Sequence, residues 1–178
     1  MKIDGREVRL RSARDALANS IGMVHQELSA IPDLTVAENV FLGKQPVNAL
    51  GKVDWAHMNS EAKKLLKGLG RDINPKRSMG SLPVGLQQLV ELSRVLFSGA
   101  RIVILDEPTS ALSPPEVKVL FEVLGRLRAG GRSFVFISHF LDDVLAVSDE
   151  ITVFRNARKI ATGPVREIDK GWLIERMI

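Results

Sequence analysis

The chain has 178 residues, of which 45% are hydrophobic and 26% are charged, and its formal net charge is +4. This composition is that of one folded domain and excludes an intrinsically disordered chain. The absence of cysteine excludes disulfides, thiolate catalysis and cysteine-ligated zinc. No apolar run approaches the length of a membrane span, and Lys and Arg form no block typical of a nucleic-acid-binding arm. We expect no direct membrane span and no nucleic-acid partner, so any membrane association would require a partner protein.

The N-terminal part of the sequence predicts small elements that lead into a buried strand. A β-hairpin is expected over residues 2–8, with its turn at Asp4-Gly5. Ser12 can cap a short helix that extends to Asn19. The apolar run over residues 21–24 predicts a strand, which leads into His25-Gln26-Glu27.

The middle of the sequence is expected to be helical. Thr35 and Glu38 have the spacing of a capping box and predict a helix toward Phe41, followed by a loop over 43–53. Amphipathic periodicity predicts two longer helices, over 54–69 and 85–97. We therefore expect a helical insert or subdomain over approximately 35–98, within a single domain over 1–178.

Strands and helices alternate in the last part of the sequence. The expected elements are a strand at 102–105, a helix capped by Ser113, a strand at 133–137, a helix to about 147, a hairpin across Asn156-Ala157 and a helix over 170–177. This alternation predicts an α/β fold with a parallel sheet that is covered on both faces.

Two acidic residues directly follow the predicted strand at 102–105. Ligands of open α/β sheets bind at the carboxyl ends of the strands. Asp106 can hold Mg²⁺ on a nucleotide, and Glu107, on the opposite side of the chain, can polarise an attacking water. An isolated pair of this kind could equally well be acidic residues that end a strand. The extension over 108–112 favours the functional interpretation.

The stretch over 105–112, Leu-Asp-Glu-Pro-Thr-Ser-Ala-Leu, resembles the Walker B motif and D-loop of ATP-binding cassette ATPases. Gln26 resembles the glutamine of the Q-loop in that family, and His139, after Ile137-Ser138, resembles its switch histidine. The order and spacing agree, and the resemblance covers essentially the whole chain. It implies a parallel sheet like that of P-loop NTPases, flanked by helices, with a helical subdomain and a C-terminal β-hairpin plus helix.

The resemblance also implies ATP and Mg²⁺ as cofactors and assigns a role to each matching position. Glu107 would be the general base, and His139 would contact the γ-phosphate. Asp106 and Gln26 would bind Mg²⁺. The residues implied to contact the nucleotide are Gln26, Asp106, Val84, Gly85 and Ser110. The alternative interpretations are a structural His139 and a solvated Gln26.

Three further stretches resemble the carbohydrate-import group of this family, in which two cassettes usually share one chain. They cover residues 22–28, 34–43 and 87–92. The resemblance is to the first cassette. It implies pairing with a second cassette, docking on membrane permease subunits, and a cytoplasmic location at the inner face of the membrane through those subunits.

The sequence departs from the family pattern in two important places. It contains no Gly-x-x-x-x-Gly-Lys-[Ser/Thr] P-loop, which in the family is preceded by a strand and followed by a helix. The signature Leu-Ser-x-Gly-Gln is altered to Leu-Pro-Val-Gly-Leu over 82–86, so that Pro83 supplies neither a hydroxyl nor an N–H. In addition, Phe140 replaces a usually basic residue and Ala157 replaces a usual glycine.

Two hypotheses follow for the function. The first is that the chain is the ATP-hydrolysing part of a carbohydrate importer; the second is that it is a non-catalytic cassette or interaction module that keeps the fold. A third, a soluble cassette protein that acts on ribosomes, is disfavoured by the stretches at 24–27 and 38–43. Without the P-loop strand, we expect exposed apolar strand faces, with marginal stability or aggregation of the isolated chain.

Overall fold

The computed structural model describes residues 1–27 and 29–178; Leu28, the last residue of the stretch at 22–28, lies outside the described residues. The strands are β1 (Lys2–Ile3), β2 (Arg6–Glu7), β3 (Ile21–Val24), β4 (Ile102–Asp106), β5 (Ser133–Ile137), β6 (Glu150–Arg155) and β7 (Arg158–Pro164). The helices are α1 (Ala13–Ala18), α2 (Val36–Val40), α3 (Trp55–Gly68), α4 (Val84–Phe97), α5 (Pro114–Ala129), α6 (Leu141–Val147) and α7 (Lys170–Met177), with 3₁₀ turns at Met79–Ser81 and Val165–Glu167.

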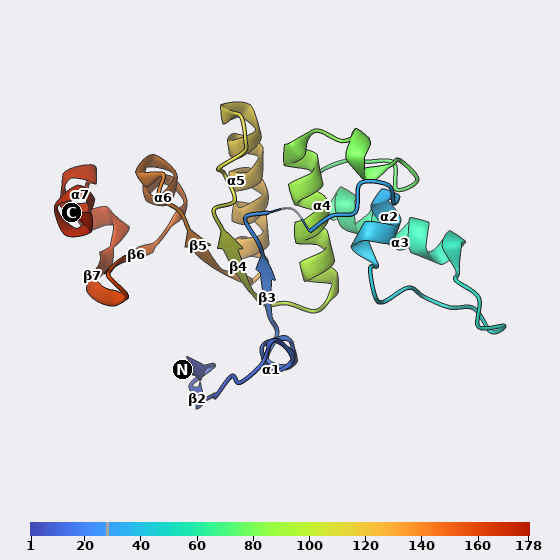
Figure 1. The fold of residues 1–178 in the computed structure, drawn as a ribbon, viewed down its shortest axis with the longest axis horizontal. Coiled ribbons are helices and arrows are strands. Elements are labelled where there is room, and N and C mark those ends of the chain that lie inside the picture. The colour runs from blue at the N-terminus through green and yellow to red at the C-terminus, as the bar shows by residue number, and fades with distance from the viewer. Residues whose placement is uncertain (28) are drawn as a thin grey trace.

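The molecule is elongated, with three groups of elements along its length (Figure 1). Helices α2, α3 and α4 form one end, strands β3, β4 and β5 with α5 form the middle, and α6, α7 and the β6–β7 hairpin form the other end. The N-terminal hairpin and α1 lie to one side of the middle group. The predicted helices and strands are all present, and the expected α/β architecture is confirmed.

The central sheet is parallel, with strand order β3-β4-β5. Side chains alternate across β4, so Val103 and Leu105 point to one face and are almost completely buried. They belong to an apolar cluster with residues of α4 and α5, including Leu92 and Leu124. This packing explains why α4 and α5 lie against the sheet.

The opposite face of the sheet is less well covered than the sequence predicted. Val135 and Ile137 of β5 are 48% and 44% exposed. Val135 lies beside Ile104, and Ile137 lies beside Asp106, so both belong to the face that α4 and α5 leave free. The prediction of a sheet covered on both faces is therefore wrong for this part of the sheet. The expectation of exposed apolar strand faces is confirmed.

The helical end of the molecule has a core of its own. Its cluster of buried side chains comes mainly from α2 and α3 and includes Val40, Met58 and Leu66. The predicted capping box begins α2, because the Thr35 amide donates to Glu38 Oε2 (2.8 Å) and the Glu38 amide donates to Thr35 Oγ1 (3.2 Å). Helix α4 contributes to both this cluster and the cluster under the sheet. The boundary of the subdomain at 35–98 stays a prediction.

The C-terminal end consists of the β6–β7 hairpin and two helices. The hairpin turns at Asn156 and Ala157, whose φ angles are +50° and +59°. These values are those of a type I′ turn, so Ala157 takes the left-handed conformation that glycine usually supplies. No helix among residues 1–27 and 29–178 is long and apolar enough to cross a membrane.

Gly22 in β3 allows α4 to pack closely against the sheet. A Cβ atom at Gly22 would overlap Val95 Cγ1 and lie 3.0 Å from Ala100 Cβ. We expect Gly22→Ala to lower the free energy of unfolding by about 1–3 kcal/mol, because an added methyl would push α4 away from β3. Urea unfolding measures this change as a lower midpoint.

A matched control is available in α5. A Cβ atom at Gly125 would meet no other atom within 4 Å. Gly125→Ala should therefore raise the free energy of unfolding, by up to about 1 kcal/mol, through helix propensity alone. Equal effects of the two alanine substitutions would contradict the packing argument.

Candidate functional site

The carboxyl ends of β4 and β5 bring two distant segments together. Glu107 directly follows β4, and its backbone amide donates to the Ile137 carbonyl at the end of β5 (2.8 Å). Glu107 has a φ of +47°, which is an unusual conformation for a residue with a Cβ atom. Backbone strain of this kind is often found at functional sites. This geometry turns the Glu107 side chain toward the residues that follow β5.

Glu107 and His139 are in direct contact. His139 Nδ1 lies 2.8 Å from Glu107 Oε2, and the Ser138 hydroxyl donates to the same oxygen at 3.4 Å. The Glu107 side chain is 16% exposed, whereas that of His139 is 63% exposed. A carboxylate held by an imidazole and open to solvent on one side can accept a proton from a bound water. The structure thus joins the two residues for which the sequence predicted catalytic roles.

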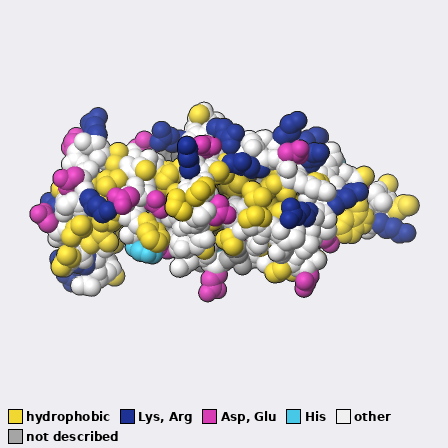
Figure 2. Space-filling model, turned by 90° about the horizontal axis from the view of Figure 1, so that it is seen from above, with side chains coloured by type: hydrophobic (Ala, Val, Ile, Leu, Met, Phe, Trp, Pro, Cys, Tyr) yellow, Lys and Arg dark blue, Asp and Glu magenta, His cyan; other side chains and the backbone are white. Residues whose placement is uncertain are grey.

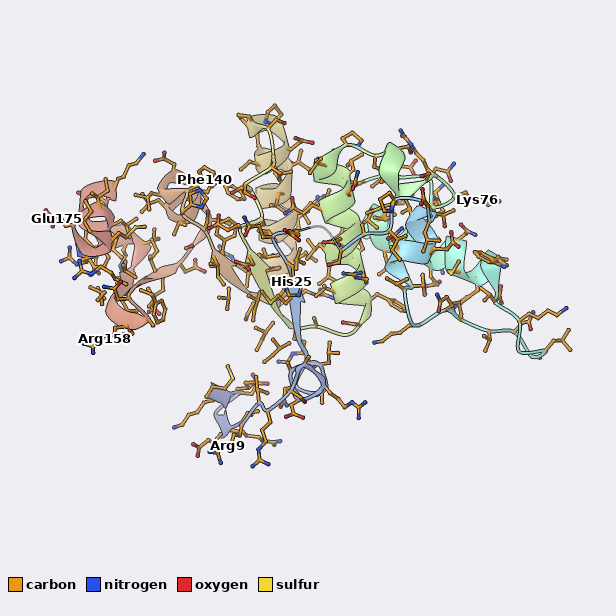
Figure 3. All side chains as sticks on the ribbon, in the orientation of Figure 1. Arg9, His25, Lys76, Phe140, Arg158 and Glu175 are labelled. Atoms are coloured by element: carbon orange, nitrogen blue, oxygen red, sulfur yellow. The ribbon has the colours of Figure 1, made fainter. Side chains whose placement is uncertain are left out.

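Ser138 was not predicted from the sequence as a member of this site. Its hydroxyl donates to Glu107 and accepts a hydrogen bond from the Phe140 amide at 3.0 Å. Phe140 begins the segment into α6, and its ring packs on His139 with 4.2 Å between ring centroids. Figure 3 shows Phe140 beyond the end of β5 and His25 beyond the end of β3. The only sequence signal for Ser138 was its position directly before His139.

Asp106 and Gln26 lie at the same edge of the sheet as Glu107. Asp106 is the last residue of β4 and is half-buried, while Gln26 is exposed in the segment that follows β3. No group of three or more His, Cys, Asp or Glu residues in the described chain could hold a metal ion by itself. The Asp106 carboxylate and the Gln26 amide could therefore supply only a minority of the ligands of Mg²⁺. This fits the usual way in which proteins bind Mg²⁺, with most ligands coming from phosphate and water.

Ser110 lies in the turn that follows Glu107. Its exposed hydroxyl donates to the Glu107 carbonyl at 2.9 Å. In the same turn, the Pro108 carbonyl accepts a hydrogen bond from Gln88 Nε2 of α4. Gln88 was not predicted as a site residue, and it ties the segment after Glu107 to the helical end of the molecule.

A cleft of about 870 Å³ lies between β5 and β6 and extends to Ser138. Its walls include apolar side chains from α5, β5, α6 and β6, namely Phe121, Phe136, Val144 and Ile151. In the described chain, β5 pairs only with β4 and β6 pairs only with β7. The strand edges that border the cleft therefore have free backbone groups, and the cleft has the chemistry to accept an extended apolar segment.

Comparison with known proteins decides the family. A family model described as ABC transporter matches residues 1–110. The chain belongs to the ABC transporter family. It is also 40% identical, over 99% of its length, to the ribose import ATP-binding protein RbsA of Caldanaerobacter subterraneus subsp. tengcongensis. The chain spans only 36% of the length of that relative.

Solved structures of ABC transporter proteins have the same fold. A metal-chelate type ABC transporter in an inward-facing conformation is 26% identical, with a TM-score of 0.74 over 89% of this chain and 63% of that chain. An ATP-binding cassette of an ABC transporter in its ADP conformation is 25% identical, with a TM-score of 0.75 over 90% of this chain and 69% of that chain. The predicted fold class is therefore confirmed.

The altered ABC transporter signature forms the beginning of α4. Pro83 is the N-cap of α4 and provides no side-chain cap, while Val84 in the first turn is 39% exposed. The Gly85 amide donates to Glu116 Oε1 of α5 at 3.1 Å. Hydrogen bonds from the Ser113 side chain and amide, and then from Gly85, lower the pKa of Glu116. The Glu116 carboxylate thus accepts the hydrogen bond of the Gly85 amide, one of the positions that the family resemblance implies contact the nucleotide.

Glu91 is a buried acid of α4 behind the Gln26 segment. It is 3% exposed, and Arg94 Nη2 lies 3.7 Å from its carboxylate. Burial raises the pKa of Glu91, and this effect is opposed by Arg94 and by the backbone at Ser29. The folded state therefore binds a proton at Glu91 more tightly than the unfolded state does.

This pKa shift predicts a pH-dependent effect of Glu91→Gln. The Glu91 carboxyl has a higher pKa in the folded state than in the unfolded state, so the wild type loses stability as the pH rises through this range. The glutamine side chain of the variant does not titrate, so the variant does not lose this stability. The free energy of unfolding of the variant, relative to wild type, should therefore increase between about pH 5 and about pH 7.5. Urea unfolding at both pH values measures the difference, and a constant or falling difference would contradict the assignment.

Proposed function

We propose that this chain is the nucleotide-binding and ATP-hydrolysing part of an ABC importer for a carbohydrate. The contact between Glu107 and His139 at the carboxyl edge of the sheet is the observation that carries the proposal. The position of Asp106 beside Glu107 and the similarity to a ribose import ATP-binding protein support it.

Each residue of the site has a chemical role in this proposal. Glu107 accepts a proton from the attacking water, and His139 and Ser138 hold the orientation of its carboxylate. Asp106 and Gln26 would hold Mg²⁺, which when bound supplies positive charge to the nucleotide phosphates. His139 is also exposed enough to contact the γ-phosphate.

The proposal includes two kinds of protein partner. A second cassette would pair with this one, with Val84, Gly85 and Ser110 facing the nucleotide between them. Membrane permease subunits would hold the pair at the cytoplasmic face of the membrane. The helical subdomain over 35–98 would carry the nucleotide state from Gln26 to those subunits.

A second candidate function is a cassette that pairs and docks without hydrolysis. Two observations favour it: Pro83 stands at the N-cap of α4 without providing a side-chain cap, and the Glu116 carboxylate accepts the hydrogen bond of the Gly85 amide. The two candidates differ in whether Glu107 matters for transport.

Carbohydrate uptake by cells that make the chain from its own gene distinguishes the two functions. Glu107→Gln should abolish uptake if the chain hydrolyses ATP, and Glu122→Gln is the matched control because Glu122 is exposed on α5. Normal uptake with Glu107→Gln would support the non-catalytic cassette instead.

A further inference from the structure

An ordered turn projects from the helical end of the molecule, between α2 and α3 (Figure 1). Val47 and Val53 pair as an isolated antiparallel bridge. The Gly51 amide donates to the Asn48 carbonyl (2.9 Å), and the Asn48 side chain accepts from the amides of Leu50 (2.9 Å) and Lys52 (3.1 Å). Most of the loop predicted over 43–53 is therefore a small hairpin with a defined conformation, which spans residues 46–54 and is here called the 46–54 hairpin.

The 46–54 hairpin presents apolar side chains to solvent. Leu50 at its tip is 81% exposed and Val47 is 63% exposed. Trp55, directly after its base, is 53% exposed. Only Val53 packs against the core of the helical end. The exposure of Leu50 and Val47 to water does not stabilise the fold, so both side chains are available to contact another apolar surface.

Positive charge accompanies these apolar side chains. Lys44 and Lys52 are exposed, and in the described part of the chain neither forms an ion pair. Asp54 is occupied as the N-cap of α3, accepting from the His57 amide at 2.9 Å. Figure 2 shows hydrophobic side chains beside Lys and Arg side chains at this end of the molecule.

We propose that the 46–54 hairpin inserts into the surface of an anionic lipid membrane. By itself, the tip of one hairpin is far smaller than the roughly 800 Å² that each side of a stable protein interface buries. Two exposed aliphatic side chains, a tryptophan and two lysines instead match the apolar boundary and negative charge of a bilayer surface. This direct contact departs from the expectation that membrane association requires a partner protein. It is additional to the docking on permease subunits proposed above and does not depend on ATP hydrolysis.

Flotation of the full chain with lipid vesicles tests the proposal and separates bound protein from aggregates. We expect binding to vesicles of about three parts phosphatidylcholine to one part phosphatidylserine, and little binding to phosphatidylcholine alone. Because the chain has no cysteine, Ala49→Cys can carry a single environment-sensitive fluorophore, with Ala129→Cys at the end of α5 as the control site. Fluorescence should increase on anionic vesicles only for the label at position 49.

Substitutions then separate the apolar and charged contributions. Val47→Ser with Leu50→Ser should weaken binding about tenfold or more. Lys44→Gln and Lys52→Gln should each weaken it about fivefold and reduce its salt dependence. Phe154→Ser is the control, because Phe154 is 66% exposed and lines the distant cleft.

Three outcomes would overturn the proposal. The first is equal binding to both kinds of vesicle. The second is binding that Phe154→Ser abolishes and the hairpin substitutions leave intact, which would assign it to the cleft. The third is the absence of vesicle binding together with permease binding that the hairpin substitutions abolish, which would assign the hairpin to a protein partner. None of these outcomes alters the expected role of Glu107.

Discussion

The isolated chain should bind ATP with a Kd of about 1 mM or weaker and should not hydrolyse it. The phosphate-binding lysine and backbone amides of a P-loop each form charge-assisted hydrogen bonds worth about 1.5–3 kcal/mol, and this sequence contains none of them. Losing several such bonds lowers affinity by orders of magnitude. Isothermal titration calorimetry measures this directly, and a micromolar Kd would contradict the prediction.

Adding a P-loop segment provides the matched comparison. A strand, a glycine-rich loop of the pattern Gly-x-x-x-x-Gly-Lys-[Ser/Thr] and a helix can be joined ahead of Met1. We propose that the added strand enters the cleft between β5 and β6, where both strand edges are free. ATP affinity should then rise about a thousandfold or more, and replacing the added P-loop lysine by alanine should reverse most of the gain.

Hydrogen exchange on the extended chain checks where the strand enters. The backbone amides of β5 that face the cleft should become protected, as should those of β6. If ATP binding became tighter without this protection, the added strand would have to pack somewhere other than the cleft between β5 and β6.

Glu107→Gln should reduce ATP hydrolysis by the extended, paired cassette about 10²–10⁴-fold while leaving ATP binding nearly unchanged. The amide keeps the shape of the side chain but cannot accept a proton from water. Single-turnover hydrolysis and nucleotide binding, measured on the same preparation, separate the two effects. A variant that hydrolyses ATP at the wild-type rate would exclude Glu107 as the base.

The contact between Glu107 and His139 makes a second variant informative. His139→Ala removes the imidazole that lies 2.8 Å from Glu107 Oε2 and should also slow hydrolysis. If the two residues act as one unit, the double variant should be about as slow as Glu107→Gln alone. Fully additive losses would mean that His139 acts separately from Glu107.

The sequence by itself determined the local elements of this protein. Ser12 and Thr35 stand at the starts of helices, where their side chains can accept hydrogen bonds from backbone amides. Both caps form as expected. The apolar run over 102–105 forms the central strand and delivers Asp106 at its end. These features depend on neighbours within a few residues, so their pattern is written directly in the sequence.

Only the tertiary structure decided which distant residues meet. The pairing of β4 with β5 sets the position of Glu107 against His139, and a shift in that register would separate them. The contact of Glu116 with Gly85 likewise depends on how α5 packs against α4. The cleft beside β5 depends on which strand edges remain unpaired. Such contacts join segments about 30 residues apart or more, where packing of the whole domain sets the distance and local preference does not.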